Sequence, residues 1–151
     1  MNVNKLFESE SEAILSEATN ALGRSHLEHY EEDGGDLAEK RLEALYGIVL
    51  QCLRRQSAMP MNRHAEEIAQ RRFQFGFELF EIQTAFNVME EAIWKRMATL
   101  LEPKEFAGAM ALVGTILGNG KDTLARTYVQ MASKHKATSL NTKALFAGTG
   151  G

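Results

Sequence analysis

The sequence predicts an all-α protein, a bundle of five or six helices in which the fourth and fifth helices are long. Apolar residues recur at three- and four-residue steps through most of the chain, which is the spacing of one helix face. No segment shows the sustained alternation with β-branched residues that predicts a strand. The two prolines, Pro60 and Pro103, each stand where an apolar period restarts. The 151 residues, 44% of them hydrophobic, suit one globular domain.

The N-terminal part is expected to form one helix and a loop. Residues 4–22 carry a thin apolar stripe and predict the first helix, with an extension as far as Tyr30 left open. The polar residues 31–35 predict the loop that follows.

Residues 35–55 predict a second helix that is buried on more than one side. Leu42, Leu45 and Val49 recur at helical steps, and further apolar residues widen the stripe. Cys52 lies on the same stripe, so we expect a buried, inert thiol rather than a nucleophile.

A short third helix is expected over Arg63–Phe73, after Pro60 and with Asn62 as its N-cap. Gly76 would let this helix end and the next one begin, because glycine adopts conformations closed to other residues.

The fourth helix is the most regular segment of the sequence. Its inward face is predicted to comprise Leu79, Ile82, Phe86, Met89, Ile93, Met97 and Leu100. Its polar residues are expected mainly on the other face, and they are Glu81, Thr84, Asn87, Glu91 and Lys95.

The fifth helix is expected to begin at Pro103, a residue that fits the first helical position. Its apolar period continues to Met131 without a phase change at Gly118–Gly120, which predicts one long helix, kinked or loosened near Gly120. We therefore expect a helical domain over residues 1–136 and a flexible tail or truncated linker over residues 137–151.

The net charge of −3 hides a strong polarity along the chain. Residues 1–43 carry −7 and residues 121–151 carry +4, an arrangement that suits attraction between the first and last helices. The acidic total argues against a nucleic-acid partner, which needs a concentrated basic face. No uncharged run is long enough to cross a membrane, and we expect a cytoplasmic location.

The sequence contains no recognisable catalytic motif, so we expect no enzyme and no cofactor. His26 and His29 lie one turn apart and His64 precedes Glu67 by three residues, but each pair is only half of a metal site. A haem or iron sensor that works through a histidine is kept as the alternative function.

An aromatic cluster around Gly76 follows Arg71 and Arg72 and comprises Phe73, Phe75, Phe77 and Phe80. The first interpretation is packing, because aromatic residues at helical spacing usually belong to a core. The second is a small apolar pocket, which Trp94 would help to form, with arginines at its mouth to hold an organic anion.

The run from residue 64 to residue 97 resembles the RsbT co-antagonist RsbR/RsbRD N-terminal domain, and also helical input domains of some bacterial histidine kinases. The residues that carry the resemblance are His64, Arg72, Gly76, Phe77, Leu79, Glu81, Ile93 and Trp94. A looser likeness spans most of residues 5–130.

The resemblance implies a non-catalytic input module of bacterial stress or two-component-type signalling, usually joined to a phosphorylatable STAS domain or a kinase core. A protein partner is therefore expected, and wide apolar stripes favour a homodimer. His64, Arg72, Phe77, Phe80 and Trp94 are the candidate ligand pocket or partner surface. No output domain follows Met131 in this sequence, and both a stand-alone protein and a part of a longer one stay open.

Overall fold

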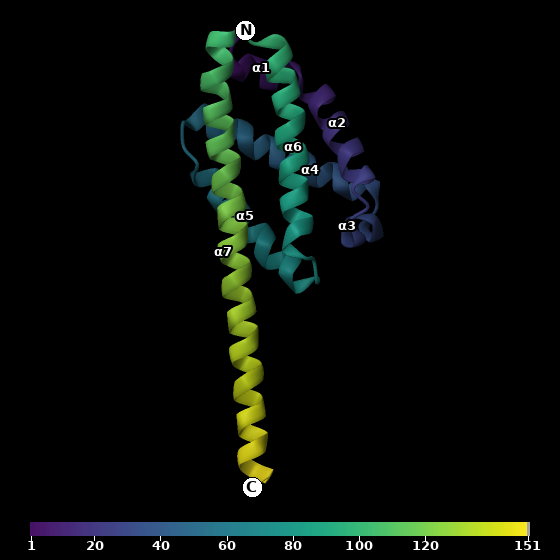
Figure 1. Cartoon of the computed structure of the whole chain (residues 1–151), viewed down its shortest axis with the longest axis vertical. Coiled ribbons are helices and arrows are strands. Elements are labelled where there is room, and N and C mark those ends of the chain that lie inside the picture. The colour runs from purple at the N-terminus through teal and green to yellow at the C-terminus, as the bar shows by residue number, and fades with distance from the viewer. Residues whose placement is uncertain (151) are drawn as a thin grey trace.

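The regular elements of residues 1–150 are all helices, so the predicted all-α class is confirmed. The structure is a computed structural model that describes the backbone of residues 1–150 and the side chains of residues 1–136. Its helices are α1 (Val3–Ser9), α2 (Ser11–Arg24), α3 (Glu28–Asp33), α4 (Gly35–Arg55), α5 (Met59–Gln74), α6 (Leu79–Leu100) and α7 (Pro103–Gly150) (Figure 1). Within residues 1–150, seven helices replace the expected five or six, and the two long helices predicted as fourth and fifth are α6 and α7.

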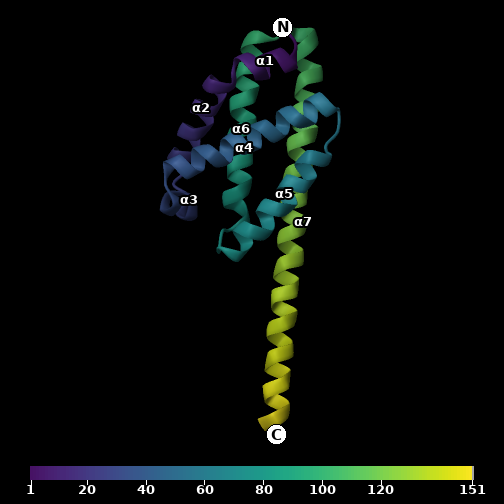
Figure 2. The same cartoon turned by 180° about the vertical axis from the view of Figure 1, so that it is seen from behind.

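Helices α6 and α7 run antiparallel and form the frame on which the others pack (Figure 1). Helix α5 packs along α7 and α2 packs along α6, while α4 crosses behind the pair. Figure 2 shows α4 and α5 from their own side, with α7 projecting well beyond the other helices. None of the helices in the described part is long and apolar enough to span a membrane.

The N-terminal part differs most from the prediction. The expected first helix is broken at Glu10 and again before Leu27, and α3 occupies most of the predicted loop 31–35. The breaks let each short helix turn its own apolar residues inward, and Gly34, at φ 90°, separates α3 from α4. Apolar periodicity did not predict these breaks, because the segments on both sides of each break carry apolar residues at helical spacing.

Helix α5 begins four residues earlier than expected. Its N-cap is Ala58, so the prediction of Asn62 as the cap was wrong. Pro60 lies inside the first turn, where a missing backbone N–H costs nothing because that donor has no partner in the helix. Cys52, on the neighbouring α4, is buried as expected, and burial raises the pKa of its thiol.

Helix α7 is continuous through Gly118–Gly120, which confirms one long helix but not the loosening expected at Gly120. A Cβ at Gly120 would lie 2.7 Å from Cε2 of Phe86 and 2.8 Å from Sδ of Met61. The glycine therefore permits close packing of α7 against α5 and α6. The side chains of residues 137–151 lie outside the described part, so the division at residue 136 and the flexible tail stay predictions.

Replacing Gly120 tests this close contact. Gly120→Ala should lower the free energy of unfolding by about 1 to 2 kcal/mol, because a methyl group overpacks the buried Phe86 and Met61 side chains. Gly118→Ala is the matched control, since nothing lies within 4 Å of its added Cβ, and it should raise stability by about 0.5 to 1 kcal/mol. Urea denaturation measures both, and equal effects of the two substitutions would contradict the close packing.

Candidate functional site

A buried carboxylate, that of Glu81, holds the corner between α5 and α6. Glu81 is 1% exposed and accepts three hydrogen bonds. The backbone N–H and Nδ1 of His29 donate at 2.9 and 2.8 Å, and the backbone N–H of Glu78 donates at 2.8 Å. The last bond belongs to the capping box that begins α6. Glu81 therefore lies inward, which corrects its expected place on the polar face.

The pKa values of the Glu81–His29 pair move apart. Burial opposes ionisation of Glu81, but the hydrogen bonds donated by His29 and Glu78 outweigh it and lower the pKa of the carboxyl. The hydrogen bond to Glu81 raises the pKa of His29, against a smaller effect of burial, and the carboxylates of Glu28 and Glu32 raise it further. The pair is therefore stabilised in its charged form.

Phe77 connects this pair to the last helix. Its ring lies 5.0 Å from the His29 ring and meets the Tyr30 ring edge-on at 5.3 Å. Its carbonyl accepts a 2.9 Å hydrogen bond from the hydroxyl of Tyr128 on α7. Gly76, at φ 85°, makes the turn that presents Phe77 in this way. Helix α3, the α5–α6 corner and α7 are thus joined at one residue.

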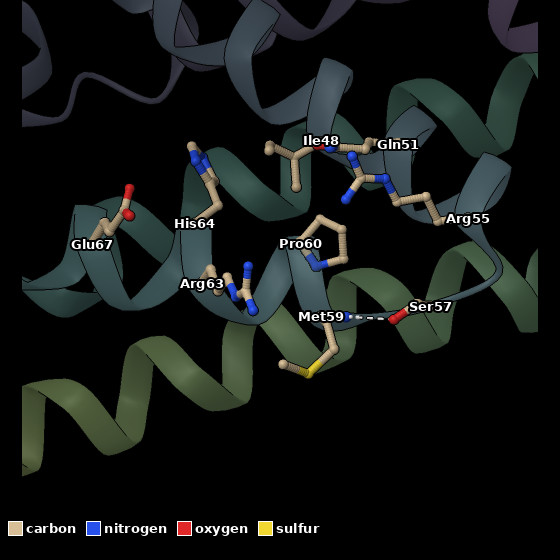
Figure 3. A pocket seen from close by; sticks show the side chains of 9 residues that line it. All are labelled: Ile48, Gln51, Arg55, Ser57, Met59, Pro60, Arg63, His64 and Glu67. Atoms are coloured by element: carbon tan, nitrogen blue, oxygen red, sulfur yellow. Dashed lines mark hydrogen bonds between the residues drawn. The ribbon is translucent and has the colours of Figure 1, made fainter.

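Two adjoining hollows lie along the groove between α4 and α5, and His64 lines both. The first has a volume of about 350 Å³ and is drawn in Figure 3, where Arg55 reaches from the end of α4 toward Pro60. Arg63 and Glu67 also line it, so its charge is mixed.

The second hollow, which we call the basic hollow, has a volume of about 340 Å³. It is lined by Leu37, Lys40, Arg41, Ala44, His64, Ile68, Arg71, Arg72 and Phe75. Four of these side chains are lysine or arginine and no carboxylate is among them. Arg72 lies at its inner end, where Nη1 donates a 2.8 Å hydrogen bond to the hydroxyl of Tyr30.

The structure divides the five candidate residues into two groups. His64 and Arg72 meet in the basic hollow, and Phe77 lies behind them, in contact with Tyr30. Phe80 and Trp94 lie elsewhere, on the outer face of α6, where they are 58% and 43% exposed. The aromatic residue that lines the basic hollow is Phe75 rather than Phe80 or Trp94.

Sequence reasoning did not assign Tyr30, Lys40, Arg41 or Tyr128 to this region, and it considered His29 only as half of a metal site. One pattern could have indicated part of it, because Leu37, Arg41 and Ala44 recur at helical steps on one face of α4. The His29–Glu81 contact spans 52 residues of sequence, and no local pattern predicts it.

His26 and His29, which were considered as metal ligands, contact two different carboxylates. Nδ1 of His26 lies 2.6 Å from Glu31, whereas His29 contacts Glu81. Among the side chains that the structure describes, no group of three potential ligands could hold a metal ion.

These features define a helical domain built around one long C-terminal helix, with a ligand-sized hollow on one side. The family model for the RsbT co-antagonist protein rsbRD N-terminal domain matches residues 12–133. The chain therefore belongs to this family, and membership indicates a regulatory input domain of stress signalling. No match was found among curated proteins or among solved structures.

Removing the charge of Glu81 should be visible in the titration of His29. We expect Glu81→Gln to lower the pKa of the His29 ring, measured by NMR, because the raised pKa depends mainly on that carboxylate. A raised folded-state pKa stabilises the protein below the unfolded value near 6.5, and this stabilisation is lost as pH rises through the folded value. The stability gap between wild type and Glu81→Gln should therefore narrow as pH rises.

Glu28→Gln is the matched control, since Glu28 acts on His29 only through its charge. It should move the pKa of His29 less than Glu81→Gln does. An unchanged titration in Glu81→Gln would mean that the pair does not form in solution.

Proposed function

We propose that this chain is a non-catalytic input domain of bacterial signalling, cytoplasmic, which binds a partner protein and a small ligand and passes a change of state along α7. Membership of the rsbRD N-terminal family supports a regulatory role. The arrangement of the helices supports transmission along α7, because α7 is part of the core and also extends beyond it (Figure 1). Packed helices can carry a change over such a distance by small discrete shifts.

The observation that carries the proposal is the hydrogen bond from Tyr128 to the carbonyl of Phe77. It is a buried contact between α7 and the α5–α6 corner, and it lies near the point where α7 leaves the other helices. Phe77 contacts Tyr30, and Tyr30 accepts the hydrogen bond of Arg72 in the basic hollow. A change in the hollow therefore has a continuous set of contacts to α7.

The partner surface that we propose is the outer stripe of α6. Phe80 and Trp94 lie on it at helical spacing, about 21 Å apart along the helix axis at a rise of 1.5 Å per residue. Exposed aromatic side chains on one stripe suit an interface, because they bury much apolar area at low entropic cost. We assign this stripe to a second copy of the chain.

The route through Tyr128 is testable in a fusion of the whole chain, through α7, to the catalytic core of a bacterial histidine kinase. Tyr128→Phe should change autophosphorylation by about fivefold, the factor that a coupling energy near 1 kcal/mol gives. The substitution keeps the ring and removes only the hydroxyl.

Tyr46→Phe is the matched control. It removes a similar buried bond, from the Tyr46 hydroxyl to the carbonyl of Phe7 at 2.6 Å, far from the corner. Both substitutions should lower the free energy of unfolding by about 1 kcal/mol, but only Tyr128→Phe should alter the kinase. Equal kinase activity in wild type and both variants would overturn the proposed route.

Light scattering after size exclusion tests whether a second copy of the chain binds the outer stripe of α6. We expect a dimer for the wild-type chain at high protein concentration and a monomer for the double variant Phe80→Gln, Trp94→Gln, with unchanged helical circular dichroism. Leu112→Gln, a change at an exposed apolar residue of α7, should leave the dimer intact. A wild-type monomer at every concentration would refute this interface.

A further inference from the structure

We propose that the basic hollow between α4 and α5 binds a small organic anion, with a phosphate or carboxylate head and a flat apolar body. This inference deepens the proposed function by naming the class of ligand. A role of the bound anion in signalling rests on that proposed function, whereas binding of the anion to the hollow does not depend on it.

The first argument is the unbalanced charge of the hollow. Lys40, Arg71 and Arg72 line it, and none of them forms an ion pair with any carboxylate whose side chain the structure describes. Arg72 is the least exposed to water of the three, and its hydrogen bond goes to the neutral hydroxyl of Tyr30. Bringing cations together at a partly buried place is unfavourable unless an anion joins them.

Arg41 supplies a donor that lacks an acceptor. Its Nη2 binds Asp33 at 2.7 Å, which uses the nearest carboxylate. Its Nη1 is buried and has no hydrogen-bond partner among the described residues. A buried donor without an acceptor is unfavourable, and an anionic oxygen that reached this donor from the hollow would satisfy it.

The titration of two lining groups agrees with an excess of positive charge. Burial lowers the pKa of Arg72, and the neighbouring Arg41 and Arg71 lower it further. Burial and the same kind of repulsion, from Arg72 and Arg71, lower the pKa of His64, although Glu67 in the adjoining hollow acts in the opposite direction. A bound anion would raise the pKa of His64, which gives the proposal a direct spectroscopic signature.

The apolar part of the lining determines the kind of anion. Leu37, Ala44 and Ile68 supply aliphatic surface, and Phe75 exposes 75% of its area at the same place. A flat body could stack on Phe75 while its head faces the arginines, whereas inorganic phosphate would leave this surface unused. The volume of about 340 Å³ suits a small organic molecule rather than a polymer.

Calorimetry with the full chain tests the site with three related probes. Phenyl phosphate carries head and body, inorganic phosphate carries the head alone, and phenol carries the body alone. We expect phenyl phosphate to bind about tenfold or more tightly than either fragment. Benzoate, measured in parallel, shows whether the hollow requires a phosphate group or accepts a carboxylate as well. Binding of either aromatic anion more tightly than the fragments supports the site.

Substitutions at the rim test the location without disturbing the core. Arg71→Gln and Lys40→Gln alter exposed side chains, and each should weaken phenyl phosphate about tenfold. Arg24→Gln makes the same change of charge on α2, outside the hollow, and should leave binding unchanged. Phenyl phosphate should also raise the pKa of the His64 ring in an NMR titration.

Three results would overturn the proposal: no binding of either aromatic anion, equal weakening by Arg24→Gln, or a His64 titration that does not respond. Inorganic phosphate binding as tightly as phenyl phosphate would indicate an adventitious ion only. The kinase fusion separates the two proposals, since an anion that binds at the hollow without changing autophosphorylation upholds the site and contradicts the signalling role.

Discussion

The structure depends on one buried ionic contact, between the carboxylate of Glu81 and His29. A charge at that depth is stable only because three donors converge on it, two from α3 and one from the start of α6. The contact fixes where α6 begins and holds α3 against the corner. Phe77 can then lie between His29, Tyr30 and the hydroxyl of Tyr128, so the position of α7 relative to this corner also follows from it.

The corner and the groove use charge in opposite ways. At Glu81 each charge has its partner, and the contact serves stability and orientation. In the basic hollow the cations outnumber the acceptors, and Asp33 is the only carboxylate among the described side chains that forms an ion pair with a lining residue. Arg72 belongs to both places, because it faces the hollow and binds Tyr30. This shared residue is why occupancy of the groove and the geometry of the corner are expected to be coupled.

Periodicity in the sequence was enough to predict α4, α6 and the continuity of α7, because each carries an uninterrupted apolar stripe. It could not predict that the first expected helix divides at Glu10, where both halves are apolar on some face. It also placed Glu81 outward, since a carboxylate is normally exposed and its partner lies 52 residues away. His64 and Arg72 were identified together from the family resemblance, but Lys40 and Arg41 come from another helix and only the tertiary fold adds them.

The close contact at Gly120 limits how α7 can move. The notch formed by Phe86 and Met61 has no room for even a methyl group, so sliding α7 by one turn would drive Ile116 or Leu124 into it. Piston-like travel is therefore blocked unless the notch itself opens. Tilting of α7 about Gly120 is not blocked in this way, because the hydrogen atom of the glycine can stay between Phe86 and Met61 while the helix changes its angle. A small tilt of the segment between Pro103 and Gly120 would then become a larger sideways displacement at the C-terminal end of α7, which projects beyond the other helices (Figure 2).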